Sequence, residues 1–201
     1  MIGGINPWAS MWTSPRSTIR TIVNVNPRYG VFFLASIYAL QTYLFFASYW
    51  SVGLSFPFYS ILLVGIVLSP LIGWVWLYFS AWILHFTGQW LGGSAPMSHL
   101  RTAVAWSKIP SSVSLLMWLI LMIAGADMVF VNGVSGPSSL FINFIAFILG
   151  IWTVVLLILS VREVQGFSLL RTLANVVLAS IINTLISFVV IFILRYIYIT
   201  V

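Results

Sequence analysis

Cysteine is absent from this chain, and charged residues are scarce. No disulfide, thiolate nucleophile or cysteine-ligated metal site can therefore form. Lys, Arg, Asp and Glu make up only 5% of the 201 residues, whereas about a quarter is usual for a soluble domain. So little charge excludes an ordinary water-soluble globular protein.

Acidic residues are the rarer charge. There are 2 of them against 8 Lys or Arg, so the formal net charge is +6. The cations are spread along the chain and do not form the clustered basic face that nucleic-acid binding needs, so no nucleic-acid partner is expected. On so apolar a chain, the cations are expected to set the orientation in a membrane.

Long apolar runs take up most of the chain, in which 62% of the residues are hydrophobic. A helix needs about 20 apolar residues to cross a hydrocarbon core of about 30 Å. Five runs are long enough, and they predict an all-α, polytopic membrane helix bundle with five transmembrane helices. Residues 1–30 then form an N-terminal cytoplasmic segment, and residues 31–201 form the membrane domain. The predicted spans are 31–50, 58–84, 112–130, 140–160 and 172–194.

Positive charge predicts the orientation, because Lys and Arg beside a span stay on the cytoplasmic side. Seven of the 8 cations precede the first span or lie in or beside the breaks at 85–111 and 161–171. The exception is Arg195, close to the C-terminus. The N-terminus is therefore predicted inside and the C-terminus outside.

Two short amphipathic segments are predicted on the cytoplasmic side. Ser14 and Pro15 suit the N-cap and first position of a helix, in which Ile19 lies on the face opposite Arg16. A similar helix is expected after Pro96. Both would lie in the membrane interface. The alternative for the first segment is a polar flank whose cations only anchor the first span.

Polar residues inside the predicted spans need a partner or a purpose, since hydrocarbon solvates them poorly. Asp127 lies near the outer end of the third span, either at the interface or paired with Asn143 or Arg195. Polar residues of the fifth span fall largely into one stripe, which either provides interhelical hydrogen bonds or lines a polar path. The candidate polar membrane residues are Asp127, Asn143, Asn175, Asn183 and Ser187.

Small residues occur at every fourth position of the second span, at Gly65, Ser69 and Gly73. This spacing predicts a face on which a neighbouring helix packs closely.

No catalytic, cofactor or metal site is predicted. The two acids, Asp127 and Glu163, fall on opposite sides of the membrane in this topology, so they cannot form a carboxylate pair within one protomer. Two histidines without cysteine or an acid cluster make a weak metal site. The chain is therefore expected to be non-enzymatic and to need no cofactor.

Several short motifs occur in the order found in a known membrane family. Over about residues 12–195, the chain resembles the Ypt-interacting-protein (Yip) membrane family. The resemblance implies five spans with a cytoplasmic N-terminus. For eukaryotic members it also implies binding of prenylated Rab-type GTPases in traffic between endoplasmic reticulum and Golgi. The matching residues are Trp12, Pro15, Arg16 and Asn26-Pro27 before the first span, Leu91-Gly92-Gly93 after the second, 105–110 before the third, and Gly166-Phe167-Ser168 before the fifth.

The chain departs from the eukaryotic members in two respects. Its segment before the first span, residues 1–30, is shorter than theirs, and their Asp-Leu-Tyr-Gly-Pro motif is missing. Both departures weaken the expectation of GTPase binding. The chain is more similar to the short prokaryotic members, which implies an integral, multi-pass location in a bacterial inner membrane.

Two functions stay open at this point. The first is a non-enzymatic protein that organises the membrane or scaffolds partners, and the second is a small permease or channel for an ion, small solute or lipid. Expected partners are anionic lipid headgroups on the cytoplasmic side and a membrane or cytoplasmic protein, and a homo-oligomer is also open. The candidate contacts for lipid or partner are Arg16, Arg20, Arg28, Arg101 and Lys108.

Overall fold

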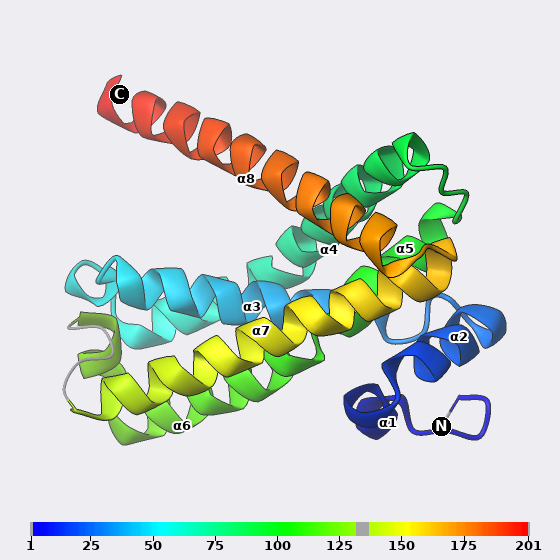
Figure 1. The fold of residues 1–201 in the computed structure, drawn as a ribbon. Helices are drawn as coiled ribbons and strands as arrows, with labels where there is room; N and C mark the ends of the chain where they lie inside the picture. Colours follow the sequence, from blue (N-terminus) through cyan, green and yellow to red (C-terminus); the bar gives the residue numbers. More distant parts are fainter. Residues whose placement is uncertain (1, 132–136, 201) are drawn as a thin grey trace.

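The computed structural model describes residues 2–131 and 137–200, with side chains for all of these except 124, 126–128, 137–139, 141, 190–191 and 193–200. Within this part of the chain the named elements are helices (Figure 1). The long helices are α3 (Val31–Tyr49), α4 (Phe58–Trp90), α6 (Ile109–Val131), α7 (Pro137–Gln165) and α8 (Leu169–Thr200). The short ones are α1 (Pro7–Thr13), α2 (Pro15–Val25), the 3₁₀ helix η1 (Val52–Leu54) and α5 (Met97–Ser107).

Among the described residues, five helices are long and apolar enough to cross a membrane, and the third of these joins α5 to α6 as Met97–Ile123. This confirms the prediction of an all-α protein with five candidate membrane-spanning helices. Helix α4 has 33 residues and α7 has 29, so at 1.5 Å per residue they are about 50 Å and about 44 Å long. Both are longer than a hydrocarbon core of about 30 Å.

The two ends of the bundle differ. At one end, here called the N-terminal end, α1, α2 and α5 gather where α3 begins and where α4 and α7 finish (Figure 1). The opposite end, called the far end, carries η1 and the C-terminus of α8 (Figure 1). The two termini therefore lie at opposite ends of the bundle.

Helix α5 is packed inside the N-terminal end. The sequence predicts a helix here with one apolar face on the membrane interface. In the structure α5 contacts α2, α3, α4 and α7, and Leu100, Thr102 and Trp106 are all fully buried. Ser107 is buried as well, whereas Ser98, His99 and Arg101 stay partly exposed.

Helices α3 and α4 form the most extensive helix pair of the bundle. Gly65, Ser69 and Gly73 are buried on α4 at this contact. A Cβ at Gly73 would collide with the Ala35 carbonyl, and one at Gly65 would lie 2.7 Å from the Tyr43 ring. The small residues therefore let the two helices approach closely.

Pro70 lies inside α4 without ending the helix. Proline has no N–H, so the carbonyl of Ile66, four residues earlier, loses its usual helical donor. The Ser69 hydroxyl donates to that carbonyl at 3.4 Å. A side chain thus replaces part of the missing backbone hydrogen bond, which hydrocarbon would not supply.

Helix α8 diverges from the other helices. It contacts α4 and α7 near its start and then leaves them towards the far end (Figure 1). Its apolar side chains are widely exposed, as at Leu185 (60%) and Phe188 (67%). Lipid is the solvent that suits such a surface.

Candidate functional site at the N-terminal end

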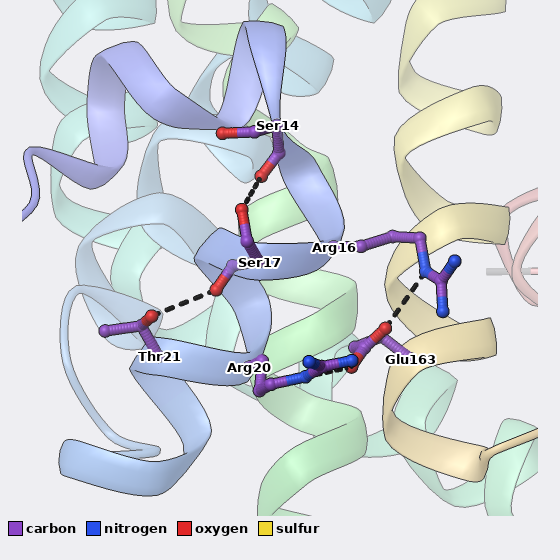
Figure 2. Close-up of polar contacts among 6 residues, drawn as sticks. All are labelled: Ser14, Arg16, Ser17, Arg20, Thr21 and Glu163. Atoms are coloured by element: carbon purple, nitrogen blue, oxygen red, sulfur yellow. Dashed lines mark hydrogen bonds and ion pairs between the residues drawn. The ribbon is translucent and has the colours of Figure 1, made fainter.

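Glu163 is a buried carboxylate in the last turn of α7, with its side chain 8% exposed. Arg16 Nε donates to Glu163 Oε2 at 3.0 Å, and Arg20 Nε donates to Oε1 at 2.6 Å (Figure 2). The two arginines are four residues apart on α2, so their side chains leave the same face of the helix. These charge-assisted hydrogen bonds hold α2 against α7. We call this arrangement the arginine clamp.

Helix α2 begins directly after Ser14, as the capping pattern predicts. The Ser14 hydroxyl donates back to a carbonyl of α1 at 3.3 Å, so it joins the two helices instead of capping α2. Ser17 and Thr21 donate to backbone carbonyls one turn earlier (Figure 2). Ile19 and Ile22 are fully buried, so the apolar face of α2 also packs onto the bundle.

Trp106 of α5 is a fully buried anchor. Its indole Nε1 donates to the Tyr29 carbonyl at 2.9 Å, and the two rings stack with centroids 6.0 Å apart. Trp8 of α1 meets the same indole edge-on at 5.6 Å. One turn earlier on α5, the Thr102 hydroxyl donates to the Pro27 carbonyl at 2.5 Å. Helix α5 therefore ties α1 and the turn between α2 and α3 to the bundle.

A cluster of buried side-chain amides joins α4, α7 and α8. Asn175 Oδ1 lies 2.5 Å from the Thr87 hydroxyl, and both residues are fully buried. Gln165 Oε1 accepts from the Ala95 N–H at 3.2 Å. A Cβ at Gly88 would collide with the Gln165 amide nitrogen and lie 3.2 Å from that of Asn175. Glycine at this position thus leaves the space in which side chains of three helices meet.

Each of the two glycines after α4 is needed for a different physical reason. Gly92 has a φ of +82°, a left-handed conformation that residues with a side chain rarely adopt. A Cβ at Gly93 would lie 2.5 Å from Gln165 Oε1 and 2.7 Å from the Phe167 ring. Two motifs that carry the family resemblance, Leu91-Gly92-Gly93 and Gly166-Phe167-Ser168, are therefore in contact across the fold.

The other predicted cationic contacts lie at the same end. The guanidinium carbon of Arg101 is 4.4 Å from the centroid of the Tyr78 ring, and Lys108 Nζ is 4.3 Å from that of Tyr38. Both distances are those of cation–π contacts. Arg28 lies in the turn between α2 and α3 and is exposed.

The predicted polar membrane residues lie in separate places. Asn175 belongs to the amide cluster just described. Asn183 and Ser187 line a groove between α8 and α4. Asn143 lines a cavity of 450 Å³ between α3, α6 and α7. The side chain of Asp127 lies outside the described residues.

Two residues of this end, Glu163 and Gln165, are not marked by any motif, whereas Trp106 lies within the segment 105–110 that carries part of the family resemblance. A signal for Glu163 does exist, because it is the one acid on the predicted cytoplasmic side, and Arg16 and Arg20 have helical spacing. No comparable signal marks Gln165, and the motif at 105–110 does not by itself indicate what Trp106 contacts. Their partners are backbone groups and glycines that are distant in the chain.

The N-terminal end presents guanidinium, hydroxyl and amide groups on a packed helical frame. Such groups bind carboxylates, phosphates and peptide groups. Among the residues that the structure describes, no group of three or more His, Asp or Glu could hold a metal ion.

Five candidate membrane-spanning helices and a packed end of short helices define a polytopic membrane protein. The family model described as the Yip1 domain matches residues 9–191, nearly the whole chain. The chain therefore belongs to the Yip1 domain family. No curated protein and no solved structure matches it significantly.

Proposed function

We propose that this Yip1-domain protein is a non-enzymatic membrane scaffold. Its N-terminal end faces the cytoplasm and binds a membrane or cytoplasmic protein. The membrane is the inner membrane of a bacterium, in line with the similarity to short prokaryotic members. The observation that carries the proposal is the arginine clamp, because it builds α1 and α2 into a folded surface beside the spans.

The clamp leaves its outer side accessible. The side chains of Arg16 and Arg20 are 48% and 65% exposed. Glu163 carries one negative charge, so it neutralises only one of the two positive charges. A partner with acidic groups can approach the free edges of both guanidinium groups while they stay paired. The cytoplasmic side is proposed because Lys and Arg are retained there.

The distribution of polar side chains supports a scaffold over a permease. Asn175 is engaged at the N-terminal end, whereas Asn143 lies in a cavity that also includes Ser48 and Ser51, close to the far end. Asn183 lies in a third place, against α4. A transport path needs polar groups that follow one another across the bilayer.

The test is co-purification of a partner from native membranes with a tagged protein. Arg16→Glu with Arg20→Glu opens the clamp and also reverses the surface charge, so binding is expected to fall at least tenfold. Adding Glu163→Arg restores the pairing with opposite signs. If binding recovers in this triple variant, the partner needs α2 docked against α7. If binding stays lost, the partner recognises the positive charge of the two arginines. Unchanged binding in the double variant contradicts the proposal.

A permease remains the second candidate because of the cavity between α3, α6 and α7. Besides Asn143 it is lined by the polar residues Gln41 and Ser114. Reconstituted vesicles decide between the two functions. Selective flux that is abolished by Asn143→Leu or Asn183→Leu contradicts the scaffold, whereas equal leakage from protein-containing and protein-free vesicles contradicts the permease.

A further inference from the structure

We infer that a cleft at the N-terminal end binds the phosphate group of an anionic phospholipid. The cleft lies between the α2–α3 turn, α4 and α5, and its volume is 160 Å³. Its polar lining comes from Arg28, Ser98, Arg101 and Tyr78, and its apolar lining includes Phe32 and Trp74. The inference does not depend on the scaffold proposal, since it needs only that the bundle lies in a membrane.

Charge is the first argument. Arg28 and Arg101 line one small cleft from two different segments. The acid of this end, Glu163, is paired with Arg16 and Arg20, and among the described side chains no carboxylate lies within 4.0 Å of Arg28 or Arg101. Two neighbouring positive charges without an acid attract an anion, and a phosphate accepts hydrogen bonds from both guanidinium groups.

The second argument is how Arg101 is held. Its guanidinium group lies over the Tyr78 ring at 4.4 Å. A cation–π contact uses the face of the guanidinium plane and leaves the N–H groups at its edge available. The Ser98 hydroxyl, one turn earlier on α5, adds a third donor to the lining.

Depth in the membrane is the third argument. Tyr78 follows Phe58 by 20 residues on α4, about 30 Å at 1.5 Å per residue, which is the thickness of the hydrocarbon core. Beginning at Trp74, one turn before Tyr78, α4 carries a ladder of exposed aromatic rings at every fourth position. Trp and Tyr gather where hydrocarbon meets headgroups. The ladder is Trp74, Tyr78, Trp82, Phe86 and Trp90.

The apolar lining favours a lipid over a soluble phosphate. Phe32 and Trp74 are 56% and 45% exposed, and below them α4 continues with exposed Leu71 and Val67. Acyl chains can lie along this surface while the phosphate stays with the arginines. A soluble phosphate would use only the polar half of the cleft.

The experiment is native mass spectrometry of the 201-residue protein, which is mixed with phosphatidylglycerol in detergent and then freed of detergent in the spectrometer. The measured quantity is the fraction of protein that keeps one bound lipid. Arg28→Gln with Arg101→Gln is expected to weaken retention of one bound lipid on the order of 20-fold, from the known attraction of each cation to an anionic surface. The control is Arg162→Gln with Arg171→Gln, which removes the same charge from the same end outside the cleft and is expected to retain the lipid. Equal loss in both double variants, or no loss in the first, overturns the inference.

A second variant tests the cleft apart from its charge. Ser98→Leu keeps both arginines but fills the space, and it is expected to reduce lipid retention as well; unchanged retention overturns the inference.

Competition between ligands identifies the source of the phosphate. Phosphatidylglycerol should displace a labelled copy of itself, whereas diacylglycerol and inorganic phosphate should not. Displacement by inorganic phosphate alone, or by diacylglycerol, overturns the assignment to a phospholipid.

Discussion

Gly73 lies against the backbone of α3, where no side chain fits. The nearest atoms to a Cβ at this position belong to the carbonyl group of Ala35 and the amide of Ser36. A backbone in a packed helix cannot move aside as the end of a flexible side chain can. Gly150 on α7 offers the contrast, because nothing lies within 4 Å of a Cβ there.

Gly73→Ala is expected to lower the free energy of unfolding by about 1 to 3 kcal/mol, the usual cost of overpacking. The measurement is thermal or denaturant unfolding in detergent. Gly150→Ala is the matched control and should leave stability unchanged or slightly raised, since alanine favours helix over glycine. Equal effects of the two substitutions would show that close contact with α3 is not the cause.

Glu163 shows how burial makes the two halves of an ion pair unequal. Its side chain is nearly enclosed, while those of Arg16 and Arg20 reach water. Without the arginines a buried carboxylate stays uncompensated. Without the carboxylate, the arginines are simply hydrated.

Arg16→Ala with Arg20→Ala is therefore expected to loosen α2 more than Glu163→Gln does. We expect a cost of about 1 to 2 kcal/mol for the double variant, because solvent screens the half-exposed arginines, and less for Glu163→Gln. Amide hydrogen exchange in α2 is the measurement. Arg162→Ala with Arg171→Ala controls for the loss of charge, and a larger effect from Glu163→Gln would contradict this account.

At the scale of elements, the start of α8 is joined to the end of α4 by Thr87 and Asn175. The hydroxyl of Thr87 lies 2.5 Å from Asn175 Oδ1 and 2.9 Å from the Ile83 carbonyl of its own helix, so two acceptors share its single proton. This interhelical contact lies on the part of α8 that is still packed, before the helix diverges. It therefore bears on the angle at which α8 leaves the bundle.

A double-mutant cycle of Thr87→Val and Asn175→Leu should give a coupling free energy of about 1 kcal/mol, within the range for hydrogen bonds between membrane helices. Thr153→Val is the control, because the hydroxyl of Thr153 donates to the Leu149 carbonyl within α7. It should show no coupling to Asn175→Leu. A coupling near zero for Thr87 would mean that the contact does not hold α8.

At the scale of the whole molecule, the short helices α1, α2 and α5 lie at the end opposite to the C-terminus of α8 (Figure 1). Because the chain has no cysteine, single cysteines can report each end without a background. Asn24 on α2 and Ser55 after η1 are both exposed, so a cysteine placed at either position can be labelled.

Ser55→Cys is expected to react with a membrane-impermeant maleimide in intact cells, and Asn24→Cys only after the membrane is opened. The reason is that the cations of the N-terminal end stay in the cytoplasm. Comparing labelling before and after permeabilisation is the measurement. Labelling of both positions in intact cells would contradict the proposed orientation.

The five long apolar helices could be predicted from the sequence because hydrocarbon leaves few choices. A run of about 20 apolar residues without charge has to satisfy its backbone within itself, so it forms a helix. The start of α2 at Pro15 and the close α3–α4 contact followed from equally local rules, the preference of proline for the first helical position and the size of the residues. The enclosed position of α5 could not be read in this way. It depends on contacts with α2, α3, α4 and α7, which no local pattern signals.

By itself, the sequence determined which segments enter lipid, since hydropathy and charge act residue by residue whatever the neighbours are. Only the tertiary structure decided which side chains meet. Arg16 and Glu163 are 147 residues apart, and Thr87 and Asn175 are 88 apart, so their pairing depends on how the helices pack. The cleft of Arg28 and Arg101 arises in the same way, because the two cations line one cleft only when the α2–α3 turn and α5 are packed side by side.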